Sequence, residues 1–252
     1  MLAANLFPRY SLKAIPVVNK AQMVEVDRLM IEEYGISLER MMENAGRNLA
    51  ILASVRFLKP YRESKRVAVL AGSGGNGGGA LVCARHLHNR GVYVDIFLTK
   101  DPGQYRGVPA EQLNIVKRMG INILDQAPSS ESASYHLIVD GIIGYSLRDA
   151  PTGGAALLIK WANKTGIPVL SLDIPSGMNC NTGEIHSPAI KADATMTLAL
   201  PKTAFLNPSA KEYFGELYLA DISVPPSLYT RPSLNLPSSF IFNDSYIIRC
   251  TF

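Results

Sequence analysis

The chain has 252 residues, of which 47% are hydrophobic and 18% are charged, and its formal net charge is +4. Lys and Arg are spread along it rather than clustered, which argues against a nucleic-acid-binding protein, and no apolar run approaches the roughly 20 residues of a membrane helix. Three scattered cysteines exclude a disulfide framework and a thiolate metal site. We expect a cytoplasmic protein, with organellar import as the alternative because the first acidic residue is Glu25.

Helix-like and strand-like segments alternate along the chain. Apolar residues at helical spacing predict helices over residues 21–34, 37–55, 81–89, 111–119 and 154–163, with Ser37 able to cap the second. Short apolar runs predict strands over residues 66–70, 92–98, 121–124, 136–139, 168–172, 194–198 and 217–219. Strands that alternate with helices form βαβ units, so we predict an α/β fold with a mainly parallel sheet. Residues 1–18 are expected to be a loose extension, 19–230 one domain and 231–252 a tail.

Three predicted strands run directly into loops of glycine and polar residues, which begin at Gly72, Asp140 and Asp173. Ligands bind at the carboxyl ends of parallel strands, so these loops should converge. The first loop, residues 72–79, holds six glycines. Glycine permits positive φ and a close approach to a ligand, and a helix N-terminus after the loop offers free N–H groups to an anion. Six glycines exceed what packing needs, which favours ligand contact.

Two common enzyme classes are disfavoured by the motifs. Gly72, Gly74 and Gly77 match G-x-G-x-x-G, but the next strand ends near Lys100 rather than in the acidic residue that dinucleotide-binding folds place about 20 residues on. Hydride transfer is therefore disfavoured. No G-x-S-x-G segment supports a Ser-His-Asp hydrolase.

Oxygen-bearing side chains occur in all three loops. Asn76, Asp140 and Ser176 are hard ligands, which suit an alkali or alkaline-earth cation rather than zinc or copper. A helix cap or a plain turn is the alternative role for Asp140 or Asp173 taken singly.

Several ordered motifs resemble the NAD(P)H-hydrate epimerases, the YjeF N-terminal domain family, from about residue 21 to residue 224. They are D-R-x-x-I-E-E-Y-G-I (27–36), M-E-N-A-G-R (42–47), A-R-H-L (84–87), D-G-I-I-G (140–144), L-D-I-P-S-G (172–177) and A-D-A-T-x-T-x-x-L-P-K (192–202). One departure occurs at residues 74–80, where the family usually has G-N-N-G-G-D-G and this chain has G-G-N-G-G-G-A.

The resemblance implies a three-layer α/β/α sandwich with a mostly parallel, Rossmann-like sheet, usually dimeric. Such enzymes interconvert the R and S forms of hydrated NADH and NADPH, which carry a hydroxyl on C6 of the nicotinamide ring. A separate NAD(P)H-hydrate dehydratase, the expected partner, removes water from the S form. One potassium ion per subunit is implied, with Asn76, Asp140 and Ser176 as ligands. The implied substrate-binding residues are Gly75, Asn76, Gly77, Gly78, Gly79, Gly144, Tyr145, Ser146, Leu147, Arg148, Asp149, Ala150 and Asp173.

Asp173 is the expected catalytic residue. A carboxyl group near C6 can protonate the departing hydroxyl and then deprotonate water that returns on the other face. Two alternatives stay open. One is a non-catalytic dimeric scaffold that binds nucleotides and has no need of Asp173 or the ion ligands. The other is an isomerase or lyase that acts on another nucleotide-like or cyclic metabolite at the same site.

Overall fold

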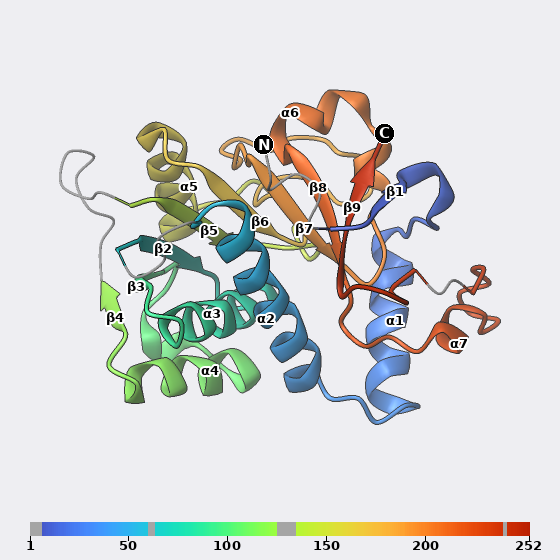
Figure 1. Cartoon of the computed structure of the whole chain (residues 1–252), viewed down its shortest axis with the longest axis horizontal. Helices are drawn as coiled ribbons and strands as arrows, with labels where there is room; N and C mark the ends of the chain where they lie inside the picture. The colour runs from blue at the N-terminus through green and yellow to red at the C-terminus, as the bar shows by residue number, and fades with distance from the viewer. Residues whose placement is uncertain (1–6, 60–63, 125–134, 239–240) are drawn as a thin grey trace.

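The computed structural model describes residues 7–59, 64–124, 135–238 and 241–252 (Figure 1). Within these ranges nine strands form one sheet in the order β1-β9-β8-β7-β6-β5-β2-β3-β4. The strands are β1 (Arg9–Ser11), β2 (Arg66–Ala71), β3 (Tyr93–Leu98), β4 (Asn122–Leu124), β5 (Leu137–Gly141), β6 (Val169–Leu172), β7 (Ala194–Leu198), β8 (Glu216–Ala220) and β9 (Ile247–Thr251). The helices are α1 (Lys20–Glu32), α2 (Leu38–Arg56), α3 (Gly75–His88), α4 (Gly107–Arg118), α5 (Gly153–Thr165), α6 (Lys211–Phe214) and α7 (Pro226–Tyr229).

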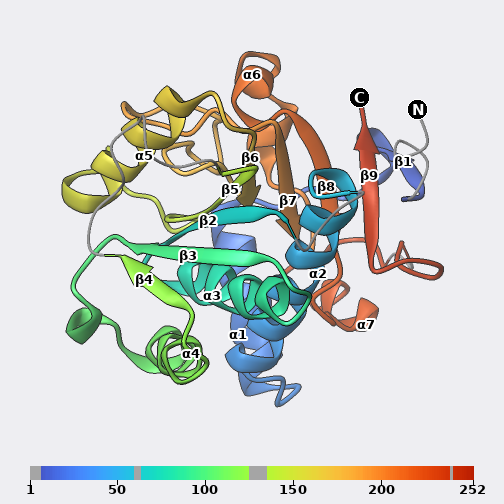
Figure 2. The ribbon, with the colours of Figure 1, turned by 60° about the vertical axis from the view of Figure 1, so that its left-hand side comes forward.

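The sheet has a helical layer on each face. Along β2, Val67 and Val69 belong to the cluster formed with α2, α3 and α4, whereas Ala68 and Leu70 belong to the cluster formed with α5. Both faces of the strand are apolar, as expected for a parallel sheet between two helical layers. Figure 2 shows α5 and α6 on one side of the sheet and α3 and α4 on the other. The predicted three-layer α/β/α sandwich is confirmed.

Strands β2 to β8 all run parallel to one another, as predicted. All seven predicted strands are present, and their ends shift by no more than two residues. Of the helices in the described ranges, none is both long and apolar enough to span a membrane.

The two ends of the chain add strands that the sequence did not indicate. β1, from the expected N-terminal extension, pairs in parallel with β9, from the expected tail, and Tyr10 lies opposite Cys250. β9 in turn pairs antiparallel with β8 (Figure 1). Both strands are short and lie at or next to the edge of the sheet, so their sequences carry little periodicity. Residues 1–6 of the expected extension lie outside the described ranges.

The helix starts show how local sequence sets the elements. Asn19 and Gln22 form a capping box at α1, in which the Asn19 side chain accepts from the Gln22 N–H at 2.9 Å. Ser37 occupies the N-cap position of α2 but makes no side-chain capping bond, so that expectation was wrong. Helix α3 begins at Gly75 rather than at residue 81, because most of the glycine-rich segment forms its first turns.

Candidate active site

The loops after β2, β5 and β6 meet at one edge of the sheet. β2 lies between β3 and β5, so the chain leaves β2 in one direction and β5 in the other. Such a switch in topology leaves a crevice at the carboxyl ends of parallel strands, where ligands bind. The Gly72 N–H donates to the Gly141 carbonyl at 3.0 Å and joins the first two loops. The Ile143 N–H donates to Ser176 Oγ at 2.9 Å and joins the second loop to the third, so the three loops lie together, as their places in the sequence predict.

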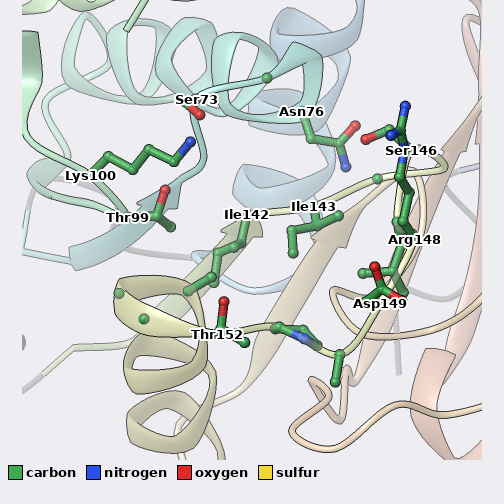
Figure 3. Close-up of a pocket in the computed structure, with 18 of the residues that line it drawn as sticks. Ser73, Asn76, Thr99, Lys100, Ile142, Ile143, Ser146, Arg148, Asp149 and Thr152 are labelled. Atoms are coloured by element: carbon green, nitrogen blue, oxygen red, sulfur yellow. The ribbon is translucent and has the colours of Figure 1, made fainter. Parts of the chain in front are cut away.

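A groove of about 880 Å³ runs along this edge (Figure 3). Lys100, just after β3, lies on one side of it, and Arg148 lies on the other. Two helices begin in its wall, α3 at Gly75 and α5 at Gly153. Helix N-termini carry free N–H groups and partial positive charge, so with the two cationic side chains they favour an anionic ligand such as a diphosphate. The lining residues are Ser73, Gly74, Gly75, Asn76, Thr99, Lys100, Ile142, Ile143 and residues 144–155.

A smaller pocket of about 310 Å³ lies beside the groove. Gly75, Asn76 and Tyr145 line both spaces and so form the boundary between them. Apolar residues and glycine make up the rest of the pocket wall, apart from three charged side chains. Those three are Asp27, Asp173 and Lys202. An apolar cavity with a few converging polar groups is typical of a small-molecule site.

Asp173 follows β6 in a left-handed conformation, with φ of 66°. Asp tolerates this region better than most residues, although such a conformation costs on the order of 1–3 kcal/mol. The Asp173 N–H donates to the Met196 carbonyl at 2.7 Å, which holds the turn in place. The turn places the Asp173 side chain in the wall of the pocket.

Lys202 forms an ion pair with Oδ1 of Asp173. The same oxygen accepts hydrogen bonds from Thr197 Oγ1 and from the Leu198 N–H, each at 3.3 Å. Asp173 is only 2% exposed and Lys202 is 0% exposed. Structural partners thus occupy Oδ1, and no described residue donates to Oδ2. That second oxygen is free to contact a ligand.

Asp140, at the end of β5, is fully buried. Its carboxylate accepts from Ser176 Oγ at 2.6 Å, from Ser171 Oγ at 2.8 Å and from the N–H groups of Ser176 and Ile142 at 2.9 and 3.2 Å. Burial raises the pKa of Asp140, and these hydrogen bonds oppose the rise. In the described ranges no Lys, Arg or His pairs with it. The buried carboxylate therefore has hydrogen bonds but no counter-charge.

Asn76 lies at the same strand ends. Its Nδ2 donates to the Leu172 carbonyl at 2.7 Å, and no described donor contacts its Oδ1. The amide packs against Gly144, where an added Cβ would lie 2.4 Å from Oδ1. Of the three predicted ion ligands, Asp140 and Ser176 are in direct contact, and Asn76 lies against Leu172 and Gly144, which belong to the strand end and the loop that carry the other two. The described residues contain no cluster of three His, Cys, Asp or Glu side chains that suits a transition metal.

The glycines of the first loop were expected to adopt positive φ and to contact a ligand. None of the six adopts a positive φ. An added Cβ would clash at four of them, for instance at 1.9 Å from the Ile142 carbonyl oxygen for Gly72 and at 1.6 Å from the Gly72 oxygen for Gly77. Gly74 has open space instead, Gly75 would make only an ordinary contact of 3.8 Å with the Met42 side chain, and both glycines line the groove. Close packing around the start of α3, against neighbouring loops, α2 and β6, thus explains most of these glycines, and Gly77 and Gly78 line neither space.

The sequence did not point to Asp27 or Lys202. Asp27 lies on α1 between Met23 and Ile31, each four residues away, and all three line the pocket. A carboxyl group on the apolar face of a predicted helix is therefore the feature of the sequence that could have indicated Asp27 as a site residue. Lys202 had no such signal, because its partner Asp173 is 29 positions away and nothing local marks a buried lysine.

Known proteins resemble this chain over most of its length. The NAD(P)H-hydrate epimerase of Dehalogenimonas lykanthroporepellens is 41% identical over 240 residues, which cover 95% of this chain and 94% of that protein. The family described as YjeF-related protein N-terminus matches residues 38–204. The chain belongs to this family. The match contains Asn76, Asp140, Asp173 and Lys202, and Asp27 precedes it.

Two further relatives extend the comparison of this YjeF-family chain. A bifunctional NAD(P)H-hydrate repair enzyme, Nnr, of Moorella thermoacetica is 34% identical over 87% of this chain and 42% of that protein. The crystal structure of the yeast protein YNL200c superposes with a TM-score of 0.78 over 93% of this chain and 100% of that one, at 22% identity. The yeast structure therefore supports the fold.

Proposed function

We propose that this YjeF-family chain is an isomerase that interconverts the R and S forms of hydrated NADH and NADPH, the activity for which relatives such as the Pirellula staleyi protein, 35% identical over 81% of this chain, are named. One observation carries the proposal. Asp173 presents a buried carboxylate with one free oxygen to an apolar pocket, beside a groove suited to a long anionic ligand.

The two spaces divide the substrate between them. The nicotinamide ring occupies the pocket, where the apolar wall suits its faces. The diphosphate lies in the groove near the N-termini of α3 and α5, with Lys100 and Arg148 to offset its charge. Residues 144–150, all in the groove wall, then contact the nucleotide.

The chemistry at C6 needs proton transfer. C6 carries the hydroxyl and is bonded to the ring nitrogen, so when the hydroxyl leaves as water the nitrogen lone pair stabilises the cation. A carboxyl group within hydrogen-bond reach of that oxygen can supply or accept the proton. Oδ2 of Asp173 is the atom for this role, because Lys202, Thr197 and Leu198 hold Oδ1.

The residues at the strand ends fit a potassium ion. Burying a carboxylate without a counter-charge is costly, and Asp140 has only uncharged donors around it in the described ranges. Asn76, Asp140 and Ser176 would hold one ion per subunit through oxygen atoms, which alkali cations prefer. When bound, the ion supplies a positive charge that orders the loops and offsets the charge of the ligand.

The family resemblance supports a proposal about the oligomeric state, the cellular compartment and the partner enzyme of this protein. The enzyme works as a cytoplasmic homodimer, and a separate dehydratase consumes the S form that it supplies. The relative of Moorella thermoacetica, named as a bifunctional repair enzyme, supports the link between two repair activities.

The test is the rate at which purified protein equilibrates the separated R and S hydrates, after subtraction of the spontaneous rate. Acceleration in both directions by the same factor is expected, because a catalyst leaves the equilibrium unchanged. A rate equal to that of heat-denatured protein would contradict the proposal. Titration with ADP-ribose would then show whether the groove binds nucleotides without catalysis.

A further inference from the structure

A second carboxyl group, that of Asp27, lines the pocket with Asp173. The two come from different elements, Asp27 from the middle of α1 and Asp173 from the end of β6. Met23 and Ile31 flank Asp27 on the same helical face and also line the pocket. The carboxyl is therefore set among apolar side chains and faces the space assigned to the ring.

Two links fix the position of Asp27. The hydroxyl of Tyr145 donates to Asp27 Oδ2 at 2.5 Å, and Tyr145 belongs to the loop that borders both groove and pocket. At the start of the same helix, Lys20 Nζ donates to the carbonyls of Ser146 and Leu147 at 3.5 and 3.3 Å. Helix α1 and the loop after β5 thus hold Asp27 and Tyr145 together at the pocket wall.

The surroundings of the two carboxyl groups differ. Asp173 has the ammonium group of Lys202 on one oxygen, whereas Asp27 forms no ion pair in the described ranges. Burial raises the pKa of Asp27, and the hydrogen bond from Tyr145 opposes the rise. Pairs of carboxyl groups in unequal environments commonly divide the roles of acid and base. Asp27 is suited to carry a proton, and Asp173 is suited to accept one.

Inversion at C6 needs proton transfer on both faces of the ring. The hydroxyl leaves from one face, and water must return to the opposite face. A carboxyl group transfers a proton to an oxygen within about 2.6–3.2 Å of it or through one water, so two groups, one on each face, serve a ring held in place better than one fixed group does.

We propose that Asp27, held by Tyr145, is a second acid–base group that acts on the face of the nicotinamide ring opposite to Asp173, an inference that rests on the epimerase function proposed above. In one direction the Asp27 carboxyl gives its proton to the C6 oxygen, and the C6–O bond breaks with its electron pair leaving on water. A water molecule on the other face then bonds to C6 and gives its proton to Asp173 Oδ2. The net change is inversion at C6 and one proton moved from Asp27 to Asp173, which the reverse reaction or solvent restores.

Inversion and oxygen exchange, followed separately in ¹⁸O-labelled water, test this assignment. The protein converts each pure isomer, and mass spectrometry after chromatographic separation gives the label in both isomers. Parent, Asp27→Asn and Asp173→Asn are compared with Glu32→Gln, which makes the same acid-to-amide change on α1 outside the pocket. Spontaneous rates are subtracted throughout.

Each of the two aspartate variants keeps one acid–base group, on one face of the ring. We therefore expect each variant to retain oxygen exchange in a different isomer. Asp27→Asn should slow inversion by about 10²–10⁴-fold, the usual contribution of an acid–base group, yet still exchange the oxygen of one isomer without inversion. Asp173→Asn should retain exchange only in the other isomer. Glu32→Gln should match the parent.

Other outcomes overturn the assignment. Inversion by Asp27→Asn at the parent rate, or loss of exchange from both isomers in Asp173→Asn alone, would leave Asp173 as the only acid–base group. Absence of any parent activity above background would instead contradict the proposed function itself. If Asp27→Asn does not fold, Tyr145→Phe provides the test, because it removes the O–H on Asp27 and keeps the ring. It should slow inversion by more than it slows exchange, and equal slowing of both would count against the assignment.

Discussion

The ammonium group of Lys202 and the carboxylate of Asp173 form an ion pair in which both side chains are almost completely buried. Asp140, at the neighbouring strand end, is equally buried but has only hydrogen bonds from uncharged donors in the described ranges. The two carboxylates thus meet the cost of burial in different ways, one with a lysine and the other with a potassium ion under our proposal.

Lys202→Met should destabilise the fold strongly, because it leaves Asp173 as a buried charge without its partner. Breaking a buried ion pair in this way typically costs about 3–5 kcal/mol, which urea unfolding monitored by circular dichroism would measure. The double variant with Asp173→Asn should recover part of that loss, since neither charge then remains. Equal unfolding free energies for the parent and Lys202→Met would show that the ion pair does not stabilise the fold.

Gly144→Ala should displace the side chain of Asn76, because the added Cβ would lie 2.4 Å from Asn76 Oδ1. We expect the epimerisation rate and the response to potassium to fall, while the melting temperature in sodium-free, potassium-free buffer changes little. Gly103→Ala is the matched control, since no atom lies within 4 Å of its added Cβ. Normal activity and potassium response in Gly144→Ala would argue that Asn76 is not a ligand.

Asp95 should contribute stability that depends on pH. Burial raises its pKa, but hydrogen bonds from Tyr135, Arg66 and Asn122 outweigh that effect and hold the pKa below its ordinary value. A lowered folded-state pKa gives stability that is fully present above the unfolded value of about 3.9 and is lost as pH falls through the folded value. Asp95→Asn should thus be less stable than the parent at pH 7, by roughly 1.5–3 kcal/mol, with a gap that narrows below pH 4. A gap that stays constant with pH would exclude this role.

Potassium chloride should raise the melting temperature of the parent, because a ligand stabilises the state that it binds. Lithium or choline chloride at equal ionic strength is the control for screening by salt. Asn76→Ala, which lacks the amide oxygen, should respond less than the parent. The same melting curve in potassium and in choline would count against a bound ion.

The strands that position the site were predictable because each is a short apolar run that ends abruptly in a polar loop. Asp140 and Asp173 stand at such ends, and the structure places both at the edge where the groove lies. Binding at strand ends is a property of the sheet rather than of any one side chain. The sequence therefore predicted which loops border the groove, whereas the roles of the individual residues stay predictions.

What could not be predicted depends on contacts between distant segments. β1 and β9 become strands only because they pair with each other, and β9 also pairs with β8. The paired residues Tyr10 and Cys250 are more than 200 positions apart in the sequence. Lys202 is buried because of Asp173, and the glycines at 72 and 77 are required by atoms of the neighbouring backbone. None of these contacts leaves a local pattern in the sequence.

Asp173→Asn tests the acid–base role of Asp173 without straining the backbone, because Asn also tolerates the positive φ at this position. It removes the proton-exchanging group and leaves Lys202 without its partner. The double variant with Lys202→Met therefore accompanies it, so that a loss of activity can be separated from a loss of stability. Circular dichroism and ADP-ribose binding on the same samples show that the fold and the groove persist.

The most direct measurement is the epimerisation rate of these variants relative to the parent, on the R hydrate and after subtraction of the spontaneous rate. We predict a fall of about 10²–10⁴-fold in both Asp173 variants, with a much smaller change in affinity for ADP-ribose. Folded variants that epimerise the hydrate as fast as the parent would contradict the assignment of Asp173 as an acid–base group.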